Sequence, residues 1–448
     1  MTTLFASAAL LPDGLARDVV IELEGARIAR VSVGSTPEGA DECHALVVPG
    51  SGNLHSHAFQ RTMAGLTERR GPTSDSFWTW RSVMYKYALS MTPDDVEAVA
   101  AQLYVEMLET GFTRVGEFHY LHHDSVGARY ANIAEMAERI AAASVETGIG
   151  LTLLPVFYAH SGFGPEPPSE QQRRFINDRD SFASLMAASR AIVAGIPGAR
   201  LGVAPHSLRA ATLEEIRDVV ALPHDGPVHI HIAEQVREVD DCLNATGARP
   251  VELLLSNADV TDRWCLVHAT HLTDAELQAI VTLRAVAGLC PITEANLGDG
   301  IFNGAEFRSA GGSYGVGSDS NVQVSLVGEL RQLEYSQRLA GRARSVLAPA
   351  NGSTAEALLL DAAVGAAQAL GVRAGIVDGA PADVVSLDIG SAQYLPDDGL
   401  LGVYVFGSGV SVSDVWVDGH KRVAGGRHPK RDVIRKRFDE SMARLVRG

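Results

Sequence analysis

The chain has 448 residues, 46% of them hydrophobic and 21% charged, which is the balance of a folded protein large enough for one large domain and a smaller companion. A formal net charge of −16 argues against nucleic-acid binding through a broad basic face. No apolar stretch approaches the roughly 20 residues that span a bilayer. The first residues, with Pro12 and Asp13 and no positive segment, do not predict a secretory signal peptide. Four cysteines without CxxC spacing favour a reducing cytoplasm. From the charge and the lack of a long apolar stretch, we expect a small-molecule partner and neither nucleic acid nor membrane.

Short apolar runs rich in Val, Leu and Ile alternate with longer amphipathic stretches through the middle of the chain. Such runs are typical of strands that are buried on both faces of a parallel sheet. Strands that alternate with helices eight times predict an α/β fold, a (β/α)8 barrel of the TIM type over residues 49–367. The eight runs are 45–50, 112–118, 150–157, 200–205, 227–233, 264–269, 285–291 and 314–319.

Three of the amphipathic stretches begin with helix-start signals. Thr92 precedes Pro93 and two acids, and Thr212 and Thr273 are each followed three residues later by a glutamate. A threonine cap, with an acid in the first turn, satisfies N–H groups that have no partner inside the helix. We therefore predict helices that begin after these threonines, the first of them ending at Gly111.

The two ends of the chain show short strands and turns instead of strand–helix alternation. Residues 1–48 contain VVIELEGARIARVSVG, and residues 368–448 contain PADVVSLDI, GVYVFGSG and VSDVWVDGHKRVAGGR. We predict that residues 1–48 and 368–448 meet in a small β-sandwich beside the barrel. Two unrelated β extensions are the alternative.

Polar side chains at the strand ends are the first functional signal, because active sites in such barrels lie at the C-terminal ends of the strands. His55 and His57 end the first strand, His231 lies in the fifth and Asp319 ends the eighth. Residues i and i+2 share one face of a strand, so His55 and His57 can point together into the barrel mouth. Three imidazoles and one carboxylate suit a divalent transition metal with a place left for water. His229 has the same parity as His231, and parity does not separate them.

This pattern resembles the amidohydrolase superfamily. The matching segments are PGSGNLHSHAF, HIHIAEQ, LVHAT and GVGSDS, in the expected order. The resemblance implies the same barrel and terminal sandwich, metal ligands at His55, His57, His231 and Asp319, and a packing or supporting role for His229. The segment GVAPHSLRA lacks the lysine that dinuclear members need after strand 4. The resemblance therefore implies one divalent ion, zinc by default or iron, as in the mononuclear subgroup that includes deaminases.

The deaminase subgroup has a glutamate three residues after the histidine of strand 5, and here that residue is Glu234. Metal-activated water would attack a carbon bonded to nitrogen, and the nitrogen leaves only when it is protonated. We expect Glu234 to deliver that proton, Asp319 to take the proton of the water, and His268 to hydrogen-bond the attacking oxygen. Without the resemblance, Glu234 could be a helix-start acid and His268 a packed strand histidine.

Donor groups near the strand ends indicate an anionic substrate. Arg81 and Arg209 can each bind a carboxylate through two hydrogen bonds, and their separation suggests two carboxylates on one small ligand. Gln60, Tyr120 and His206 can add further donors. Each of these residues also has an ordinary structural explanation, such as an exposed helix position for Arg81 or aromatic packing for Tyr120.

Longer segments narrow the resemblance to the formimidoylglutamate deiminase family. They are HSHAFQRTMAGLTERRG, SFWTWRSVMY, GEFHYLHHD, APHSLRA, HIHIAEQ and ELRQLEYSQRL. The resemblance implies hydrolysis of N-formimino-L-glutamate, a small dicarboxylate, to N-formyl-L-glutamate and ammonia in histidine breakdown. A homodimer is common among the relatives. The family's substrate contacts carry over to Gln60, Arg81, Tyr120, His206 and Arg209.

Three alternatives stay open at this point. N-formimino-L-aspartate is one methylene shorter, and the sequence does not exclude it. A purine or triazine deaminase on the same scaffold would have no need of Arg81 and Arg209. A non-catalytic metal-binding barrel would be expected to have lost Glu234 or Asp319, and the chain has both.

Overall fold

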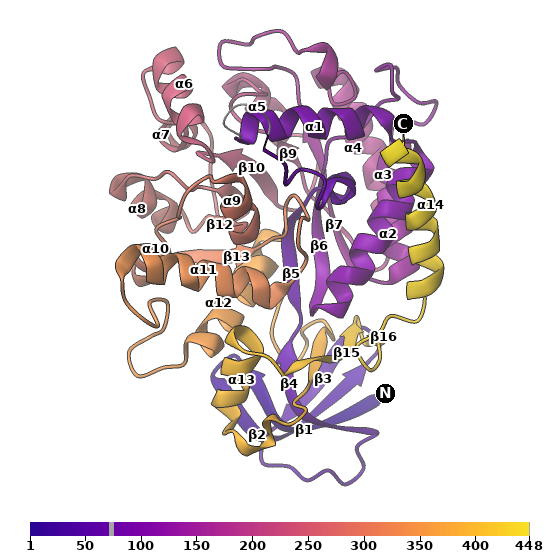
Figure 1. The fold of residues 1–448 in the computed structure, drawn as a ribbon, viewed down its shortest axis with the longest axis vertical. Coiled ribbons are helices and arrows are strands. Elements are labelled where there is room, and N and C mark those ends of the chain that lie inside the picture. The colour runs from indigo at the N-terminus through magenta and orange to yellow at the C-terminus, as the bar shows by residue number, and fades with distance from the viewer. Residues whose placement is uncertain (71–75, 448) are drawn as a thin grey trace.

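The computed structural model describes residues 1–70 and 76–447, which form a barrel of strands inside a layer of helices with a separate sheet at one end (Figure 1). Five of the strands confirm the predicted runs to within about two residues, and the fourth run is split into two short strands. The barrel strands are β5 (Ser51–Ser56), β6 (Phe112–His119), β7 (Gly150–Phe157), β8 (Arg200–Leu201), β9 (Ala204–Pro205), β10 (Val228–Ile232), β11 (Trp264–His268), β12 (Val286–Leu289) and β13 (Ser313–Val316).

Parallel pairing joins these strands into two arcs. One arc has the order β5-β6-β7-β8, with β9 also paired to β7, and the other has the order β10-β11-β12-β13. The Val203–Val228 bridge joins the arcs at one seam, and the Ser56–Asp319 bridge joins them at the other. The strands therefore run round a ring in chain order, and the predicted α/β barrel is confirmed.

Helices surround the barrel, and three of them begin where the sequence predicts. The Thr92 hydroxyl accepts a hydrogen bond from the Asp95 N–H at 3.2 Å, and the same cap occurs at Thr212 and Thr273. The helices around the barrel are α1 (Phe77–Ser90), α2 (Pro93–Glu109), α3 (Glu135–Thr147), α4 (Arg179–Ala194), α5 (Leu213–Val220), α6 (Val236–Thr246), α7 (Pro250–Asn257), α8 (Asp274–Leu283), α9 (Pro291–Leu297), α10 (Gly304–Ser309), α11 (Leu326–Gly341) and α12 (Thr354–Ala369). None of the helices in the described ranges is both long and apolar enough to cross a membrane.

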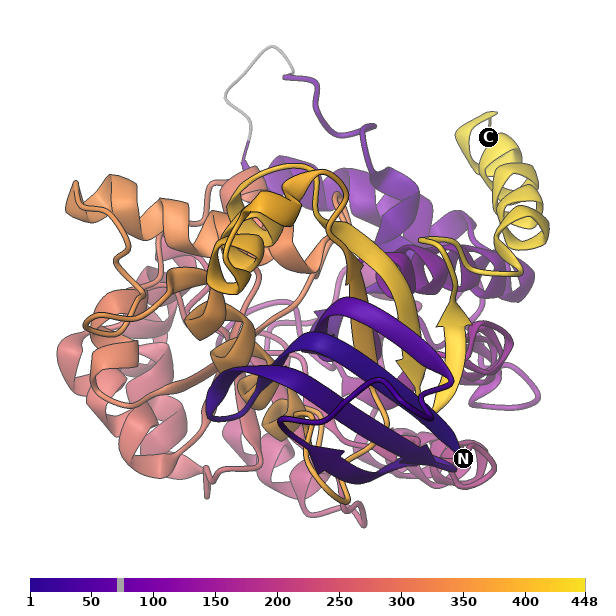
Figure 2. The same cartoon turned by 90° about the horizontal axis from the view of Figure 1, so that it is seen from below.

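Both chain ends contribute to one sheet below the barrel. Its order is β16-β15-β14-β4-β1-β2-β3, and antiparallel pairing of β14 with β4 joins the C-terminal strands to the N-terminal ones. The alternative of two unrelated extensions is therefore wrong. The seven strands form one continuous, curved hydrogen-bonded sheet (Figure 2), so the small β domain is built from both chain ends as expected. The strands are β1 (Thr2–Leu11), β2 (Gly14–Glu24), β3 (Arg27–Ser32), β4 (Glu42–Pro49), β14 (Val384–Asp388), β15 (Ser411–Val417) and β16 (His420–Val423).

Two further expectations need correction at the domain boundaries. The run 45–50 is not the first barrel strand: it belongs to β4 of the terminal sheet, and β5 begins directly after it. Strand β5 (SGNLHS) is buried but has only one large apolar residue, Leu54, so a search for apolar runs finds β4 and misses β5. The C-terminal segment also contains α13 (Asp397–Phe406) and α14 (Arg431–Arg447), and Arg444 of α14 forms an ion pair with Asp95 of α2. The boundaries at residues 48 and 368 stay predictions.

Close packing of α12 against β13 generates a stability prediction. A Cβ on Gly365 of α12 would lie 1.9 Å from the Tyr314 carbonyl oxygen, whereas a Cβ on Gly402 of α13 would meet no atom within 4 Å. We expect Gly365→Ala to lower the free energy of unfolding by about 1–3 kcal/mol, because backbone must move. The matched Gly402→Ala change should leave it unchanged or raise it by about 0.4–1 kcal/mol. Denaturant unfolding followed by circular dichroism measures both, and equal stability of the two variants would contradict this packing.

Candidate metal centre and cavity

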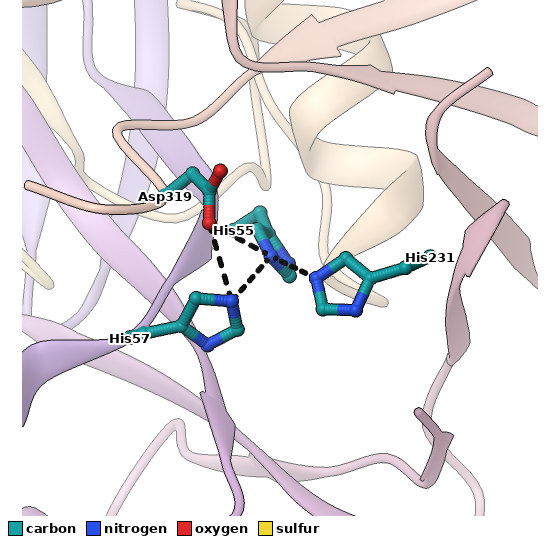
Figure 3. A group of neighbouring side chains, drawn as sticks. All are labelled: His55, His57, His231 and Asp319. Atoms are coloured by element: carbon teal, nitrogen blue, oxygen red, sulfur yellow. Dashed lines mark hydrogen bonds and ion pairs between the residues drawn. The ribbon is translucent and has the colours of Figure 1, made fainter. Parts of the chain in front are cut away.

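Four side chains from three strand ends meet at the mouth of the barrel. His55 and His57 come from the end of β5 and its following residue, His231 from β10, and Asp319 from the segment after β13 (Figure 3). The His55 Nε2 lies 3.1 Å from the His57 Nε2 and 2.9 Å from the His231 Nε2. The Asp319 Oδ1 lies 3.2 Å from the His57 Nε2. All four ligand atoms lie within 4.8 Å of one another, which is the size of a single-ion site.

The protonation of this group suits a divalent cation. Burial lowers the pKa of His55 to about 3 and holds the pKa of His231 well below its usual value. Burial alone would raise the pKa of Asp319, but the adjoining His55 and His57 side chains hold it well below its usual range. Neutral imidazoles and an ionised carboxylate are the forms that bind a metal. The His57 Nδ1 donates to the Phe118 carbonyl at 2.9 Å, so its Nε2 lone pair is left for an ion.

Backbone contacts and polar side chains hold Asp319 in place. The Asp319 N–H donates to the His55 carbonyl at 2.9 Å, and the His57 N–H donates to the Asp319 carbonyl at 3.0 Å. The Asn321 Nδ2 donates to the carbonyls of His57 and Asp319 at 3.0 and 2.9 Å. Asp319 has a φ of 45° and Asn321 one of 57°, conformations that persist only where neighbours enforce them. Sequence reasoning missed Asn321, although it follows the matched segment GVGSDS.

His229 lies apart from this group. Its Nε2 donates to the Ala369 carbonyl at 2.7 Å, at the end of the buried helix α12. The prediction that His229 is a packing or supporting residue is consistent with this contact. His229 and His231 share a face of β10, but His231 lies nearer the C-terminal end of the strand, so only His231 reaches the group at the mouth.

Glu234 and His268 lie beside the four ligands. The His268 Nε2 is 3.8 Å from the Glu234 Oε1 and 3.8 Å from the Asp319 Oδ2. Burial lowers the pKa of His268, but Glu234, Glu294 and Asp319 together raise it to about 10. Its Nδ1 lies 3.3 Å from the Glu294 Oε1, a contact that turns the Nε2 toward the cavity. His268 is thus a hydrogen-bond donor that faces two carboxylates.

One cavity of about 540 Å³ contains the predicted substrate residues as well as Glu234, His268 and Asp319. The Gln60 Nε2 donates to the Tyr120 hydroxyl at 2.8 Å. Sequence reasoning missed five aromatic residues of the cavity wall, of which Tyr158 directly follows β7 and the others lie in α1 or in a loop. We call them the aromatic wall: Phe77, Trp80, Tyr85, Tyr158 and Phe175. The cavity is lined by His57, Gln60, Phe77, Trp80, Arg81, Met84, Tyr85, Tyr120, Tyr158, Phe175, His206, Arg209, His231, Glu234, His268, Leu297 and Asp319.

The two cavity arginines have different surroundings. The Arg209 Nη2 lies 3.3 Å from the Glu234 Oε2, and its Nε lies 3.8 Å from the Glu238 Oε1. Burial lowers the pKa of Arg209, but Glu238 and Glu234 more than offset this and raise it. The Arg81 guanidinium instead lies over the rings of Trp78 and Tyr85, at 5.1 and 5.6 Å. Sequence reasoning did not identify Glu238.

Two further buried acids support the site without lining the cavity. The Glu117 Oε1 accepts a hydrogen bond from the Ala58 N–H at 2.6 Å, directly after His57. Burial raises the pKa of Glu117 to about 7. Glu294 accepts from the Cys290 N–H at 2.8 Å and fixes its own carboxyl toward His268. Arg61, in contrast, pairs with Glu106 at 2.8 Å and does not line the cavity.

Comparison with known proteins agrees with this geometry. Residues 46–422 match the model of the amidohydrolase family. The chain belongs to the amidohydrolase family. Residues 1–45 match a second model, described as the N-terminal domain of the formimidoylglutamate deiminase HutF.

Curated relatives and solved structures of other proteins are similar to this amidohydrolase to different degrees. A formimidoylglutamate deiminase of Pseudomonas aeruginosa is 47% identical over the full length of both chains. The crystal structure of an amidohydrolase from Brucella melitensis is 55% identical, has a TM-score of 0.97 and covers both chains completely. A 5-methylthioadenosine/S-adenosylhomocysteine deaminase of Natronomonas pharaonis is 27% identical over 86% of this chain and 83% of its own. A zinc-bound adenosine deaminase structure from Xanthomonas campestris, 20% identical with a TM-score of 0.82 over 100% of this chain and 99% of its own, shares the fold.

The geometry predicts how metal content responds to two matched histidine changes in β10. His231→Ala removes one of four converging ligand atoms, so we expect the metal bound per chain to fall strongly. His229→Ala removes a fully buried imidazole that bonds the Ala369 carbonyl and lies outside the four-residue group, so metal content should not change. Elemental analysis of the purified variants measures both. Full metal occupancy in His231→Ala, or equal loss in both variants, would show that the ligand set is misassigned.

Proposed function

We propose that this amidohydrolase hydrolyses N-formimino-L-glutamate to N-formyl-L-glutamate and ammonia, as a step of histidine degradation. The observation that carries the proposal is a single cavity that combines a four-ligand metal group, an acid beside it and two guanidinium groups. A substrate with two carboxylates and one hydrolysable C=N carbon matches that combination. The full-length similarity to the Pseudomonas enzyme supports the same reaction.

His55, His57, His231 and Asp319 would hold the ion, and zinc fits three imidazoles and one carboxylate. A divalent cation in this position supplies water that is nucleophilic near neutral pH. The Asp319 Oδ2 faces His268 and is the oxygen that can take a proton from the attacking water. The His268 Nε2, which faces Asp319 and Glu234, would donate a hydrogen bond to the oxygen that attacks.

Glu234 supplies the remaining proton. Its carboxyl lies between His268 and Arg209. Only 5% of the residue is exposed, so little solvent reaches the carboxyl that would transfer the proton. The leaving nitrogen becomes ammonia by gaining the two protons of the attacking water: Glu234 would pass one to the formimino nitrogen, and Asp319 would return the other as the C–N bond breaks. The C–N bond then breaks, and the new C=O bond of the formyl group remains on the product.

The two carboxylates of the substrate are assigned to the arginine side of the cavity. Arg209 and Arg81 can each bind one carboxylate through paired N–H groups. Burial and the charge of Arg209 hold the pKa of His206 well below its usual value, so His206 acts as a neutral hydrogen-bond partner. Tyr120, which accepts from Gln60, can donate its own hydroxyl to the ligand. The homodimer and the cytoplasmic location stay predictions.

Replacing Glu234 tests proton delivery. Glu234→Gln keeps the shape and the contact with Arg209 but removes the acid, so we expect kcat to fall about 10²- to 10⁴-fold. Metal content should not change, because Glu234 is not among the four converging ligands. Steady-state ammonia release and elemental analysis measure the two effects. Turnover at the wild-type rate would refute this role for Glu234.

Replacing Arg209 tests the recognition of a diacid. A charged hydrogen-bond partner contributes about 1.5–3 kcal/mol, so Arg209→Met should raise KM for N-formimino-L-glutamate about 10- to 100-fold. Arg179→Met serves as the control, because Arg179 pairs with Asp218 and does not line the cavity. Initial rates over a range of substrate concentrations give KM. An unchanged KM in Arg209→Met would argue for another orientation of the substrate.

A further inference from the structure

Helix α1 forms one wall of the cavity and carries one of its two arginines. It lies across the end of the barrel that faces away from the terminal sheet (Figure 1). Five of its side chains line the cavity, namely Phe77, Trp80, Arg81, Met84 and Tyr85. The position of α1 therefore decides where the Arg81 guanidinium stands relative to Arg209.

The last turn of α1 is held by an arginine from a distant loop. Arg174 is fully buried, with 0% of the residue exposed. Its Nη1 donates to the Ala88 carbonyl and, at 2.8 Å, to the Met91 carbonyl. Its Nε donates to the His123 carbonyl at 2.7 Å, and its Nη2 lies 3.4 Å from the Tyr130 hydroxyl. Among residues 1–70 and 76–447, the hydrogen bonds of Arg174 thus go to carbonyls and a hydroxyl and none to a carboxylate.

Burying a cation that is bonded to carbonyls and not to a carboxylate is costly, so these contacts need a physical reason. The last carbonyls of a helix have no partners within it and carry the negative end of its dipole. The last turn of α1 contains no basic residue of its own. Arg174 supplies the missing donors and the opposite charge to that turn, which compensates for its burial. Burial lowers the pKa of Arg174, and the neighbouring Tyr130 and Asp124 offset part of this effect.

The backbone around Arg174 connects the same loop to the barrel and to the cavity. The Arg174 carbonyl accepts hydrogen bonds from the N–H groups of His122 and His123, each at 3.0 Å, just after β6. The next residue, Phe175, lines the cavity and packs on the Tyr120 ring at 4.9 Å between centroids. Arg174 therefore fixes α1 to a rigid part of the barrel next to the substrate site.

We propose that Arg174 is a positioning residue for substrate binding, which fixes the end of α1 so that Arg81 meets a carboxylate of the substrate. This inference rests on the proposed function, because it assigns Arg81 to a substrate carboxylate. Arg174 itself does not line the cavity and contacts neither the metal group nor Glu234.

A double-mutant cycle with Arg81 separates positioning from a general loss of stability. In the wild-type background, Arg174→Met should raise KM for N-formimino-L-glutamate about tenfold, with kcat within about threefold of wild type. In the Arg81→Met background, the same change should leave KM unchanged within about twofold, because the group that Arg174 positions is already absent. Equal increases in KM in both backgrounds, or a fall in kcat alone, would overturn the proposal.

Controls keep the test decisive. Arg173→Met changes the neighbouring arginine, which bonds the Ser125 and Glu170 carbonyls and not α1, so KM should not change. If Arg174→Met does not fold, Arg174→Lys enters the same cycle, since lysine keeps the charge but has no planar fork of donors. Hydrogen exchange of the α1 amides should be faster in the Arg174 variant than in Arg173→Met, and equal exchange would contradict the proposal. Absence of wild-type turnover would instead refute the proposed function, and the exchange result would still decide whether Arg174 holds α1.

Discussion

Closure of the barrel between β5 and β13 is the constraint on which the site depends. The two backbone hydrogen bonds between Asp319 and the His55–His57 segment are part of that seam. The hydrogen bonds that close the ring therefore also bring the Asp319 carboxylate to the His55 and His57 imidazoles. His231 arrives on the opposite arc and completes the group. A fold that failed to close would separate the ligands, so metal binding and barrel formation are coupled.

Charge in the cavity is balanced locally, because the chain as a whole is acidic. A net charge of −16 would repel a dianionic substrate over long distances. Close to the metal group, Arg209 and Arg81 supply positive charge, and Glu234 and Glu238 are held on Arg209. A metal ion adds further positive charge beside Glu234. The cavity can thus attract carboxylates at short range while the protein surface stays acidic.

The sequence predicts the parts of this architecture that depend on local pattern. Strands such as 112–118 and 150–157 were recognisable because both of their faces are buried, and the ligands lie at strand ends, where parity and position suffice. The split of the fourth strand was not, because it lies where the backbone at Gly202 packs closely on a distant segment: a Cβ there would lie 2.5 Å from the carbonyl oxygen of Pro227, just before β10. The aromatic wall and Arg174 were also missed. Most of these residues lie in helix α1 or in the loop that contains Arg174, and no sequence periodicity predicts how these two segments cross the barrel.

The most direct test of the account is ammonia release from N-formimino-L-glutamate by the purified protein, measured before and after removal of metal. N-formimino-L-aspartate and 8-oxoguanine serve as comparison substrates. The account predicts rapid release from the glutamate derivative, loss of release with a chelator, recovery with zinc, and no release from the neutral purine. Release from the purine but not from the formimino diacid, or undiminished release from metal-free protein, would contradict it.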